Sequence, residues 1–521
     1  MPNNQKYKLC ILAAGKGTRN TTVVNLHKAL LPLENRAVIS HIINSVSKHI
    51  EIVIAVGYLA EQVTSYVTEV FPDRNISFVH IDNYDGPGSG PGLSLLKCKD
   101  YLQTPFIFTS ADTVVKESFI YEKLEENWLG VATVPVEQSI NYCLVQGSKY
   151  LDKLYYGTGT KAYIGVAGIY SYQDFWDSLE NHKIIKDEYQ VVHGFDGLDK
   201  IRLLDFTWFD TGNNAAYNKA REHFSNEIVA VKAQESLFVD EGKVIKYFAD
   251  SAIVTKRVQR TKFLSGYAPA VRQLNSNMYS YDFVPGQMLS NVLDDNILKD
   301  ALSLYLNELA STQFEKDNQF LANCKTIYEE KIYSRITYFA NSKLDRIQYI
   351  NGVQVPPILD LLDRVDWNLI YNTAIPSRFH GDFQPENIVY GKEGFKLIDW
   401  RDSFGSSLEI GDMYYDLGKL YHALIINGQV VLDKGYYYEI QENNAFIGYN
   451  IKSNLQLLLD LFETFCEENK LNWHNVKLLG ILQYIGICSL YEDFHEGRYG
   501  EFLFLLGKYM LTKNLNNGKL N

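Results

Sequence analysis

Apolar and polar positions in the first half of the chain follow two periods in turn, one typical of buried strands and one typical of amphipathic helices. Buried strands are indicated by apolar runs at residues 7–11, 51–56, 76–81, 104–110 and 201–209. Residues 38–49 and 60–71 carry apolar side chains at helical spacing between the first three runs. Strands that alternate with helices predict an α/β fold with a mostly parallel, Rossmann-like sheet.

The pattern changes after the first 224 residues. A hairpin is indicated at residues 236–248, where two apolar strands flank the turn Asp-Glu-Gly. Most of the chain beyond this hairpin is helical by period, including residues 296–314, 455–467 and 476–494. A chain of 521 residues is also too long for one compact core. We therefore predict two domains, residues 1–228 and 229–521, the second of α+β class with a largely helical C-terminal lobe.

Composition excludes several classes of function. The formal net charge of −12 argues against a nucleic-acid-binding protein, for which we would expect a basic face. The six cysteines form no C-x-x-C pair, which favours reduced thiols over a zinc site or a disulfide framework. No signal peptide and no uncharged run of membrane-spanning length is visible. We expect a cytoplasmic protein without membrane insertion, and the sequence leaves its oligomeric state, including a homo-oligomer, open.

The first strand leads into a glycine-containing loop, L-A-A-G-K-G-T-R, at residues 12–19. In open α/β sheets, ligands bind where loops follow the carboxyl ends of strands. Gly15 and Gly17 lack the Cβ atoms that keep a polyanion from the backbone, so amide groups from Ala14 onward can face phosphate oxygens. Arg19 adds a planar cationic group. The loop is a candidate phosphate-binding site, although a G-x-G pair alone also fits an ordinary strand-to-helix turn.

Two aspartates follow strands later in this half. Asp112 comes after the apolar run 104–110, and Asp210 lies in the sequence W-F-D-T-G. A carboxylate at the carboxyl end of a central strand is well placed to hold Mg²⁺ against a triphosphate. Either aspartate alone is also typical of a turn or a helix cap. Together with the glycine loop, the two aspartates form a specific set of candidate residues.

The glycine loop and the following segment H-K-A-L-L-P-L, which contains Lys28, resemble the signature of the sugar-phosphate and phosphocholine nucleotidyltransferases, L-A-A-G-x-G-T-R followed by P-K-x-L-x-P. His27 stands where that family usually has proline. The resemblance implies that Arg19 and Lys28 are catalytic and offset charge on the departing pyrophosphate. It also implies that Asp112 and Asp210 are the Mg²⁺ ligands.

Three further features are given roles by this resemblance. The loop D-G-P-G-S-G-P-G at residues 85–92 would contact the nucleotide base through Gly88 and Gly90, but it departs from the usual family form and leaves the base open. Lys161 and Glu188 flank a strand predicted at residues 163–170 and could line the site of the phosphate ester. For both, a solvated surface charge is the alternative.

A second set of candidate residues lies in the second half. The sequence H-G-D, which ends at Asp382, is followed by Asn387, and a strand then leads into I-D-W, which contains Asp399. In kinases with this layout, Asp382 would take the proton of the acceptor hydroxyl, while Asn387 and Asp399 would hold Mg²⁺ between the ATP phosphates. The form H-G-D-x-x-x-x-N with I-D-W resembles the aminoglycoside phosphotransferase and choline kinase superfamily. That resemblance implies a bilobal, protein-kinase-like fold.

Other positions follow from the same resemblance. Lys246, in the hairpin, would face nucleotide phosphates. Arg401 stands where choline kinases commonly show an acidic residue, and it is a weaker candidate for the acceptor site. The helix expected at residues 251–264 contains no Glu or Asp, so the usual Lys–Glu ion pair lacks its acidic member. Asp250 is a substitute for that member on position alone.

A kinase makes a phosphate ester, and a nucleotidyltransferase consumes one. We therefore hypothesise a bifunctional enzyme that phosphorylates a small alcohol, choline-like or other, with ATP and couples the product to a nucleotide, first of all from CTP, with release of pyrophosphate. In the families that the chain resembles, such products serve surface polysaccharide or head-group synthesis. One alternative is an anomeric sugar kinase joined to a sugar-1-phosphate nucleotidyltransferase that makes an NDP-sugar. Another is a regulatory protein with inactive enzyme-like domains.

Overall fold

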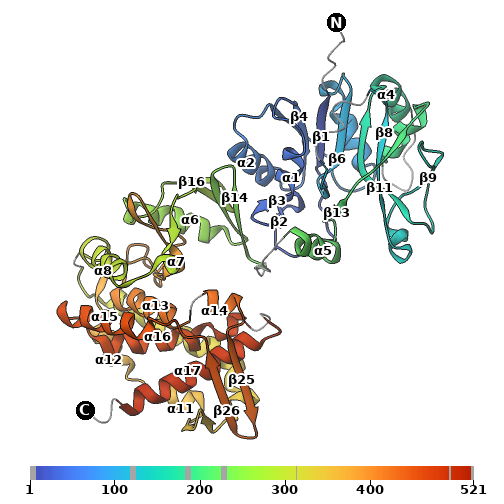
Figure 1. Ribbon diagram of the computed structural model, residues 1–521. Coiled ribbons are helices and arrows are strands. Elements are labelled where there is room, and N and C mark those ends of the chain that lie inside the picture. The colour runs from blue at the N-terminus through green and yellow to red at the C-terminus, as the bar shows by residue number, and fades with distance from the viewer. Residues whose placement is uncertain are drawn as a thin grey trace. The chain divides into compact units, whose positions relative to one another are not determined.

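The computed structural model describes residues 7–117, 125–181, 189–224, 232–312, 314–426, 428–491 and 495–517. Packing divides the chain into two compact units, which can be followed by colour in Figure 1. The first unit contains Met1–Val254 and Arg272–Phe283, and the second contains Thr255–Val271 and Val284–Asn521. The boundary expected between residues 228 and 229 falls outside the described residues, so it stays a prediction.

A mixed sheet forms the centre of the first unit. Its strand order is β10-β9-β11-β6-β1-β4-β5, with β8 beside β11 and β12 beside β8. The central strands β6, β1, β4 and β5 are parallel, as the sequence predicts. The strand β11 runs antiparallel to β6 and β8, so the central run of parallel strands ends at β6. The bounds are β1 (Lys8–Ala13), β4 (Ile52–Val56), β5 (Ile76–His80), β6 (Phe106–Ser110), β8 (Trp128–Thr133), β9 (Leu144–Gln146), β10 (Lys153–Tyr155), β11 (Lys161–Ile169) and β12 (Arg202–Asp205).

Side chains of β1 alternate between two hydrophobic clusters. Ile11 belongs to the cluster that includes residues of α1 (Val38–Asn44) and α2 (Ala60–Val70). Leu12 belongs to the other cluster, with residues of α3 (Pro91–Lys97) and α4 (Tyr172–Glu180). Figure 1 shows α1 and α4 on different sides of β1. Because helices cover both faces, the carboxyl ends of the parallel strands are left as the edge where ligand-binding loops can gather.

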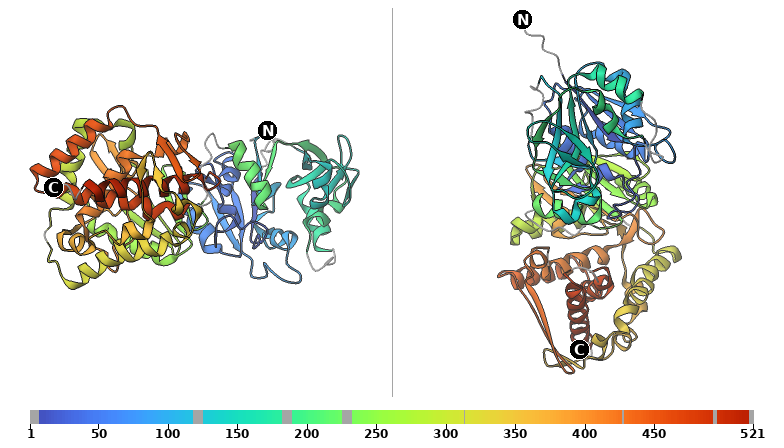
Figure 2. Two further views of the ribbon diagram at one scale, coloured as in Figure 1. Left: turned by 90° about the horizontal axis from the view of Figure 1, so that it is seen from below. Right: turned by 90° about the vertical axis from the view of Figure 1, so that its right-hand side faces the viewer.

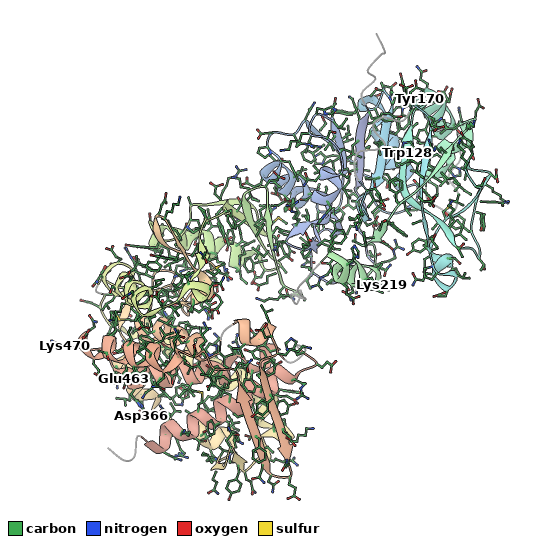
Figure 3. The ribbon with its side chains drawn as sticks, viewed as in Figure 1. Trp128, Tyr170, Lys219, Asp366, Glu463 and Lys470 are labelled. Atoms are coloured by element: carbon green, nitrogen blue, oxygen red, sulfur yellow. The ribbon has the colours of Figure 1, made fainter. Side chains whose placement is uncertain are left out.

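Trp128 fixes the packing of the antiparallel part of the sheet. Its side chain is fully buried on β8, and a Cβ on Gly168 of β11 would lie only 2.0 Å from its indole Nε1. Figure 3 shows Trp128 within the first unit and Tyr170, at the end of β11, near the edge of the unit. The glycine on β11 is therefore required by the close approach of the indole ring.

The single strand predicted at residues 201–209 is wrong, because the structure has two strands there. The strand β12 pairs in parallel with β8, whereas β13 (Trp208–Asp210) pairs antiparallel with β7 (Thr113–Val115). The chain thus leaves the large sheet between β12 and β13. The helix α5 (Asn214–Phe224) follows β13. This break brings the end of β13 beside the end of β6, where the predicted metal ligands lie.

A four-stranded sheet completes the first unit, in the order β14-β15-β17-β16. The predicted hairpin is confirmed, since β14 (Glu235–Asp240) pairs antiparallel with β15 (Lys243–Phe248) around a left-handed turn. The other strands are β17 (Met278–Asp282) and β16 (Val271–Asn275). This sheet packs on α2: the rings of Tyr66 and Phe238 lie 5.2 Å apart, and the buried carboxylate of Glu69 accepts a hydrogen bond from Ser280 at 2.8 Å.

The second unit is largely helical and carries small sheets. Its longest described helices are α13 (Met413–Ile425), α15 (Leu455–Glu468), α16 (Trp473–Ile487) and α17 (Arg498–Asn517). Two glycines let α13 and α16 approach closely, because a Cβ on Gly480 would lie 2.9 Å from the carbonyl oxygen of Gly418. The residues of the H-G-D-x-x-x-x-N segment lie around β22 (Ile388–Gly391) and β23 (Gly394–Leu397), which form an antiparallel pair.

The sequence pattern missed a long hairpin in the second unit. The strands β25 (Tyr436–Gln441) and β26 (Asn444–Tyr449) pair antiparallel within a region that we expected to be helical. They lie beside α17, as Figures 1 and 2 show. Among the helices of the described part of the chain, none is both long and apolar enough to cross a membrane.

Candidate functional site

The glycine loop follows β1, the strand that lies between β4 and β6 in the parallel centre of the sheet. Gly17 has a φ of +62°, in the left-handed region that favours glycine. A Cβ there would lie 2.6 Å from Cδ of Lys28, whereas a Cβ on Gly15 would meet no atom within 4 Å. The loop therefore packs tightly on the Lys28 side chain at one glycine and leaves open space at the other, which fits a backbone cradle for phosphate.

Lys28 lies at the start of a short 3-10 helix, Lys28–Leu30. Its Nζ forms an ion pair with Oδ2 of Asp112 at 2.8 Å, and both side chains are largely buried. Asp112 lies two residues after the end of β6, the neighbour of β1 in the sheet. Two residues that are 84 positions apart in sequence are thus brought together at the carboxyl ends of adjacent parallel strands.

Asp210 joins this group through the pairing of β13 with β7. Its register partner is Thr113, the neighbour of Asp112 in sequence. A Cβ on Gly212 would lie 3.0 Å from Oδ1 of Asp210, 3.2 Å from Oδ2 of Asp112 and 3.7 Å from Nη2 of Arg19. Both predicted metal ligands and the predicted catalytic arginine therefore converge on one space that only a glycine leaves open.

The two carboxylates differ in their electrostatic environment. Burial alone would raise the pKa of Asp112, but the charges of Lys28 and Arg19 outweigh burial, and its pKa is lowered. Burial and the charge of Asp112 raise the pKa of Asp210. A second, partly buried carboxylate without its own lysine is a favourable place for a divalent cation with oxygen ligands. The residues present therefore fit Mg²⁺, held by Asp112 and Asp210.

Tyr142 is a site residue that no sequence pattern indicated. Its hydroxyl donates to Oδ2 of Asp210 at 3.1 Å, and its ring packs edge-on against Trp208 at 5.3 Å. Burial and then the nearby Asp210 charge raise the pKa of Tyr142 to about 12, so the hydroxyl stays a donor at neutral pH. No motif pointed to this tyrosine, because its contact with Asp210 spans 68 residues of the chain.

His27 packs against the backbone of the glycine loop. Its ring is fully buried, and Nδ1 accepts a hydrogen bond from the backbone amide of Ala29 at 3.1 Å. Burial first, and the charge of Lys28 second, lower the pKa of His27 to about 3. The backbone of Ala13 and Gly15 also lies beside the ring. A neutral imidazole thus fills the place where the related signature has proline, and it holds Lys28 next to the loop.

The second glycine-rich loop lies at the start of α3. Gly88 and Gly90 have left-handed φ values of +83° and +133°. A Cβ on Gly90 would lie 2.8 Å from the carbonyl oxygen of Tyr189. Lys16, from the first glycine loop, forms an ion pair with the exposed Asp85, which ties the two loops together. The predicted contact of Gly88 and Gly90 with a base stays a prediction.

The two candidates for the phosphate-ester site have different outcomes. Lys161 begins β11, and its Nζ lies 3.6 Å from Oδ1 of Asp205, a mostly exposed carboxylate. A surface ion pair of this kind contributes little to stability and does not indicate a ligand. Glu188 lies outside the described residues. Lys161 thus pairs with Asp205 and not with a residue of the group around Gly212, and the role of Glu188 stays a prediction.

In the second unit, the predicted catalytic loop is assembled around Asp382. Oδ2 of Asp382 accepts a hydrogen bond from Nδ2 of Asn387 at 2.8 Å, and Oδ1 forms an ion pair with Lys419 at 3.1 Å. Burial alone would raise the pKa of Asp382, but the charge of Lys419 outweighs burial and lowers it. Because Asn387 donates through its nitrogen, its side-chain carbonyl oxygen is directed away from Asp382 and suits a metal ligand.

Asp399 follows β23 in a left-handed conformation, with a φ of +55°. Its Oδ1 forms an ion pair with Nη1 of Arg257 at 2.5 Å. Arg257 lies on α6 (Ser251–Arg260), the helix that lacks the acidic residue usual in the kinases that the sequence resembles. Asp250, the substitute suggested by position, accepts a hydrogen bond from the amide of Ala252 at the start of α6, and its pairing with Lys246 stays a prediction. The helix α6 therefore contacts Asp399, the predicted metal ligand, through the cationic side chain of Arg257.

Two buried charged residues hold the predicted catalytic loop in place. Asp416 accepts hydrogen bonds from the amides of His380 and Gly381 at 2.6 and 2.7 Å. Arg260 is fully buried and donates to backbone carbonyl oxygens on both sides of the site, including those of Phe379 and Leu408. Neither residue was predicted from the sequence as a positioning group. Lys246 lies on β15 of the first unit, so its predicted role stays a prediction.

Comparisons with known proteins bear on the first unit. Residues 9–162 match the family model described as the MobA-like NTP transferase domain. The chain therefore contains an N-terminal nucleotidyltransferase domain and is an enzyme with an NTP as substrate of that domain. The match ends at residue 162, so the kinase interpretation depends on the residues of the second half alone.

Curated relatives and solved structures cover part of the chain. The bifunctional protein GlmU of Methanococcus maripaludis strain C5 is 27% identical over 261 residues, which is 45% of this chain and 60% of that protein. The GlmU protein of Methanococcus vannielii is 31% identical over 127 residues, 24% of this chain and 29% of that protein. The chain thus spans 60% of the length of the first relative and less of the second.

Among solved structures, the CTP:phosphocholine cytidylyltransferase of Streptococcus pneumoniae is 19% identical and covers 42% of this chain and 100% of its own, with a TM-score of 0.37. A UDP-glucose pyrophosphorylase complexed with UDP-glucose is 18% identical over 42% of this chain and 98% of its own, with a TM-score of 0.36.

Proposed function

We propose that this protein is a bifunctional enzyme, in which a kinase-like second half phosphorylates a small hydroxyl compound with ATP and the first half couples the ester to a nucleotide. The observation that carries the proposal is the convergence of Arg19, Asp112 and Asp210 on the open space at Gly212. Arg19 and Asp112 lie in the region, residues 9–162, that matches NTP transferases. In this proposal the second half has a bilobal, protein-kinase-like fold, supported by the arrangement of Asp382 and Asn387.

In the nucleotidyl step, an oxygen of the phosphate ester attacks the α-phosphorus of the nucleoside triphosphate, and the bond to pyrophosphate breaks. The backbone of the glycine loop would bind the triphosphate, and Arg19 would offset charge on the departing pyrophosphate. Lys28 keeps Asp112 ionised through their 2.8 Å ion pair. Mg²⁺ held by Asp112 and Asp210 would neutralise the reacting phosphates. No general base is needed, because a phosphate ester is already ionised near neutral pH.

In the kinase step, the acceptor hydroxyl oxygen attacks the γ-phosphorus of ATP, ADP leaves with the bridging oxygen, and the hydroxyl proton passes to Asp382. The lowered pKa of Asp382 supports this role, since the carboxylate must be ionised to accept the proton. Mg²⁺ held by Asn387 and Asp399 would neutralise the ATP phosphates. In that state Arg257 must give up its ion pair with Asp399 or share the carboxylate with the metal.

The first proposal for the nucleotide is CTP, and for the acceptor a small alcohol, choline-like or other. A sugar phosphorylated at its anomeric hydroxyl and coupled to another nucleotide is the second candidate. The glycine-loop signature at residues 12–19 also supports this second candidate, because it resembles the signature of the sugar-phosphate nucleotidyltransferases. The proposed setting is surface polysaccharide or head-group synthesis.

The experiment is product analysis after incubation of the full chain with ATP, Mg²⁺, CTP or UTP, and a panel of alcohols and sugars. We expect ADP, pyrophosphate and a nucleotide-linked product from the same acceptor. Pyrophosphate release from supplied phosphate esters, without any ADP formation from the free acceptors, would remove the kinase half of the proposal. Release of neither product would support the alternative of inactive enzyme-like domains.

A further inference from the structure

The two oxygens of the Asp382 carboxylate face different surroundings. Oδ2 accepts from Asn387, the predicted metal ligand, at 2.8 Å. Oδ1 lies 3.1 Å from Nζ of Lys419, on α13. Oδ2 of Asp382 therefore faces the side of the catalytic loop where the nucleotide would bind. The second oxygen marks the opposite side, where an acceptor hydroxyl can approach the carboxylate without crossing the metal site.

Four cations gather on this second side, and we call them the acceptor-side cations: Lys331, Arg335, Arg401 and Lys419. Lys331 and Arg335 are one turn apart on α10 (Lys331–Ala340). The hydroxyl of Tyr415 joins the group, 2.8 Å from Nη1 of Arg401. The pKa of Tyr415 is lowered to about 8 because Arg401, Lys331 and Lys419 outweigh its burial, which places these charges around one hydroxyl.

The positive charge of this group is poorly balanced by the residues that the structure describes. Arg335 donates to the neutral carbonyl oxygen of Gly486, and Nε of Arg401 donates to that of Ser403. Lys331 has no hydrogen bond or ion pair through Nζ within the described ranges. Burial, together with the charges of Arg401, Arg335 and Lys419, lowers the pKa of Lys331 to about 8.

Two carboxylates in the described part of the chain act on the cluster, Asp382 and Asp402. Asp402 is shared, since it also lies 3.8 Å from Nζ of Lys256 and accepts from its neighbour Ser403. Partly buried cations that are held together without matching carboxylates are costly unless a ligand supplies the missing negative charge. A quaternary ammonium acceptor such as choline would instead add a further like charge to the cluster.

We propose that the acceptor of the kinase step is an anionic hydroxyl compound whose carboxylate or phosphate is bound by Lys331, Arg335 and Arg401 while its hydroxyl lies at Asp382. The proposal rests on the kinase function proposed above and replaces its choline-like acceptor. In the transfer itself, the acceptor oxygen forms the new bond to the γ-phosphorus, ADP departs, and Asp382 receives the proton. The anionic group is held but does not react.

The rival role for the same cations is binding of the ATP phosphates. The two roles differ in kinetics, because loss of an acceptor contact raises the KM of the acceptor and loss of a phosphate contact raises the KM of ATP. The variant Lys331→Met keeps much of the side-chain volume and removes only the charge. Lys331→Arg is the conservative rescue, and Lys343→Met is a matched control on an exposed lysine just beyond α10.

The test measures ADP formation by the full chain with ATP, Mg²⁺ and matched acceptors: glycerate against glycerol, gluconate against glucitol, and glycerol 3-phosphate and choline. We expect turnover of at least one anionic member, and a higher kcat/KM for it than for its neutral partner. For that acceptor, Lys331→Met should raise KM by about 10- to 100-fold, the range of a lost charge-assisted contact. The KM of ATP should stay within about twofold, and Lys331→Arg should recover most of the loss.

The outcomes separate this inference from the kinase proposal. Glycerol, glucitol or choline used as well as the anionic compounds would overturn the anionic acceptor and leave the kinase standing. A raised KM for ATP in Lys331→Met, with the acceptor KM unchanged, would assign the cluster to ATP and also overturn the inference. No ADP from any acceptor would reject the kinase function itself. Glycerate and glycerol 3-phosphate distinguish a carboxylate from a phosphate as the bound group.

Discussion

The space at Gly212 gives the sharpest test of the nucleotidyltransferase site. In the variant Gly212→Ala, the new Cβ would lie 3.0 Å from Oδ1 of Asp210 and 3.2 Å from Oδ2 of Asp112. If these contacts relax to roughly 3.4 Å, the two carboxylate oxygens must move apart by about 0.2 to 0.4 Å each. The substitution therefore shifts both predicted metal ligands and touches little else, since the next atom, Nη2 of Arg19, is 3.7 Å away.

A shift of this size has a measurable effect on chemistry and a small one on folding. Mg²⁺ requires near-ideal octahedral geometry, and displacement of reacting groups by about 1 Å can reduce rates 10²-fold. For shifts of only about 0.2 to 0.4 Å, we therefore expect pyrophosphate release to fall by about 3- to 10-fold. The φ of Gly212 lies outside the left-handed region, so alanine adds no backbone strain. The free energy of unfolding should change by less than about 1 kcal/mol.

The assay is pyrophosphate release with the most active pair of nucleotide and phosphate ester, together with thermal unfolding of the same preparations. The matched control is Gly486→Ala in the second unit, where the new Cβ would meet its nearest neighbour, Cγ1 of Ile332, at 3.6 Å. That variant should retain nucleotidyl transfer. Wild-type pyrophosphate release by a folded Gly212→Ala protein would refute the placement of Mg²⁺ between Asp112 and Asp210.

Three further predictions concern single residues. Lys28→Met removes the cation 2.8 Å from Asp112 and should reduce kcat/KM for pyrophosphate release by about 10²-fold or more, with ADP formation unchanged; equal activity would contradict the role of Lys28. Asp382→Asn should reduce ADP formation by about 10³-fold and leave pyrophosphate release from a supplied ester intact; loss of both activities in a folded variant would exclude independent sites. His27 has a folded pKa of about 3 against its ordinary 6.5, so the unfolded chain binds the extra proton and stability falls as pH drops below 6.5. Between pH 7 and pH 5, denaturant unfolding should show a loss of about 2 kcal/mol that His27→Gln does not share, and equal losses would contradict a neutral buried His27.

The first site could be predicted from sequence because its residues follow strands of a parallel sheet. Apolar runs located β1 and β6, and the parallel arrangement then places the residues after them at one edge. Gly17 and Asp112 were found in this way. Asp210 was found by family resemblance, although the strand before it is broken into β12 and β13. Periodicity does not report such a break, since both pieces are apolar.

Other contacts could not be predicted, because they join residues of no recognisable pattern over long stretches of chain. Tyr142 donates to Asp210 across 68 residues, and Arg257 pairs with Asp399 across 142. In each case the sequence shows an ordinary polar residue on a helix or in a loop. The acceptor-side cations are a similar case, since the charge of Lys331 acts on Tyr415 only when α10 packs in the folded second unit. A negative net charge gave no hint of them, because charge acts locally in salt solution.

In both sites a lysine keeps a carboxylate ionised, but the charge that is left without a partner is negative at the first site and positive at the second. In each, a lysine lies about 3 Å from the carboxylate that must be ionised, Lys28 at Asp112 and Lys419 at Asp382, and in each it lowers the pKa of that carboxylate. At the first site the residue left over is a carboxylate, Asp210, with a raised pKa, which favours a bound cation. At the second site the residues left over are cations, which favour a bound anion. Charge balance therefore favours Mg²⁺ at the first site and, for the same reason, a negatively charged acceptor at the second.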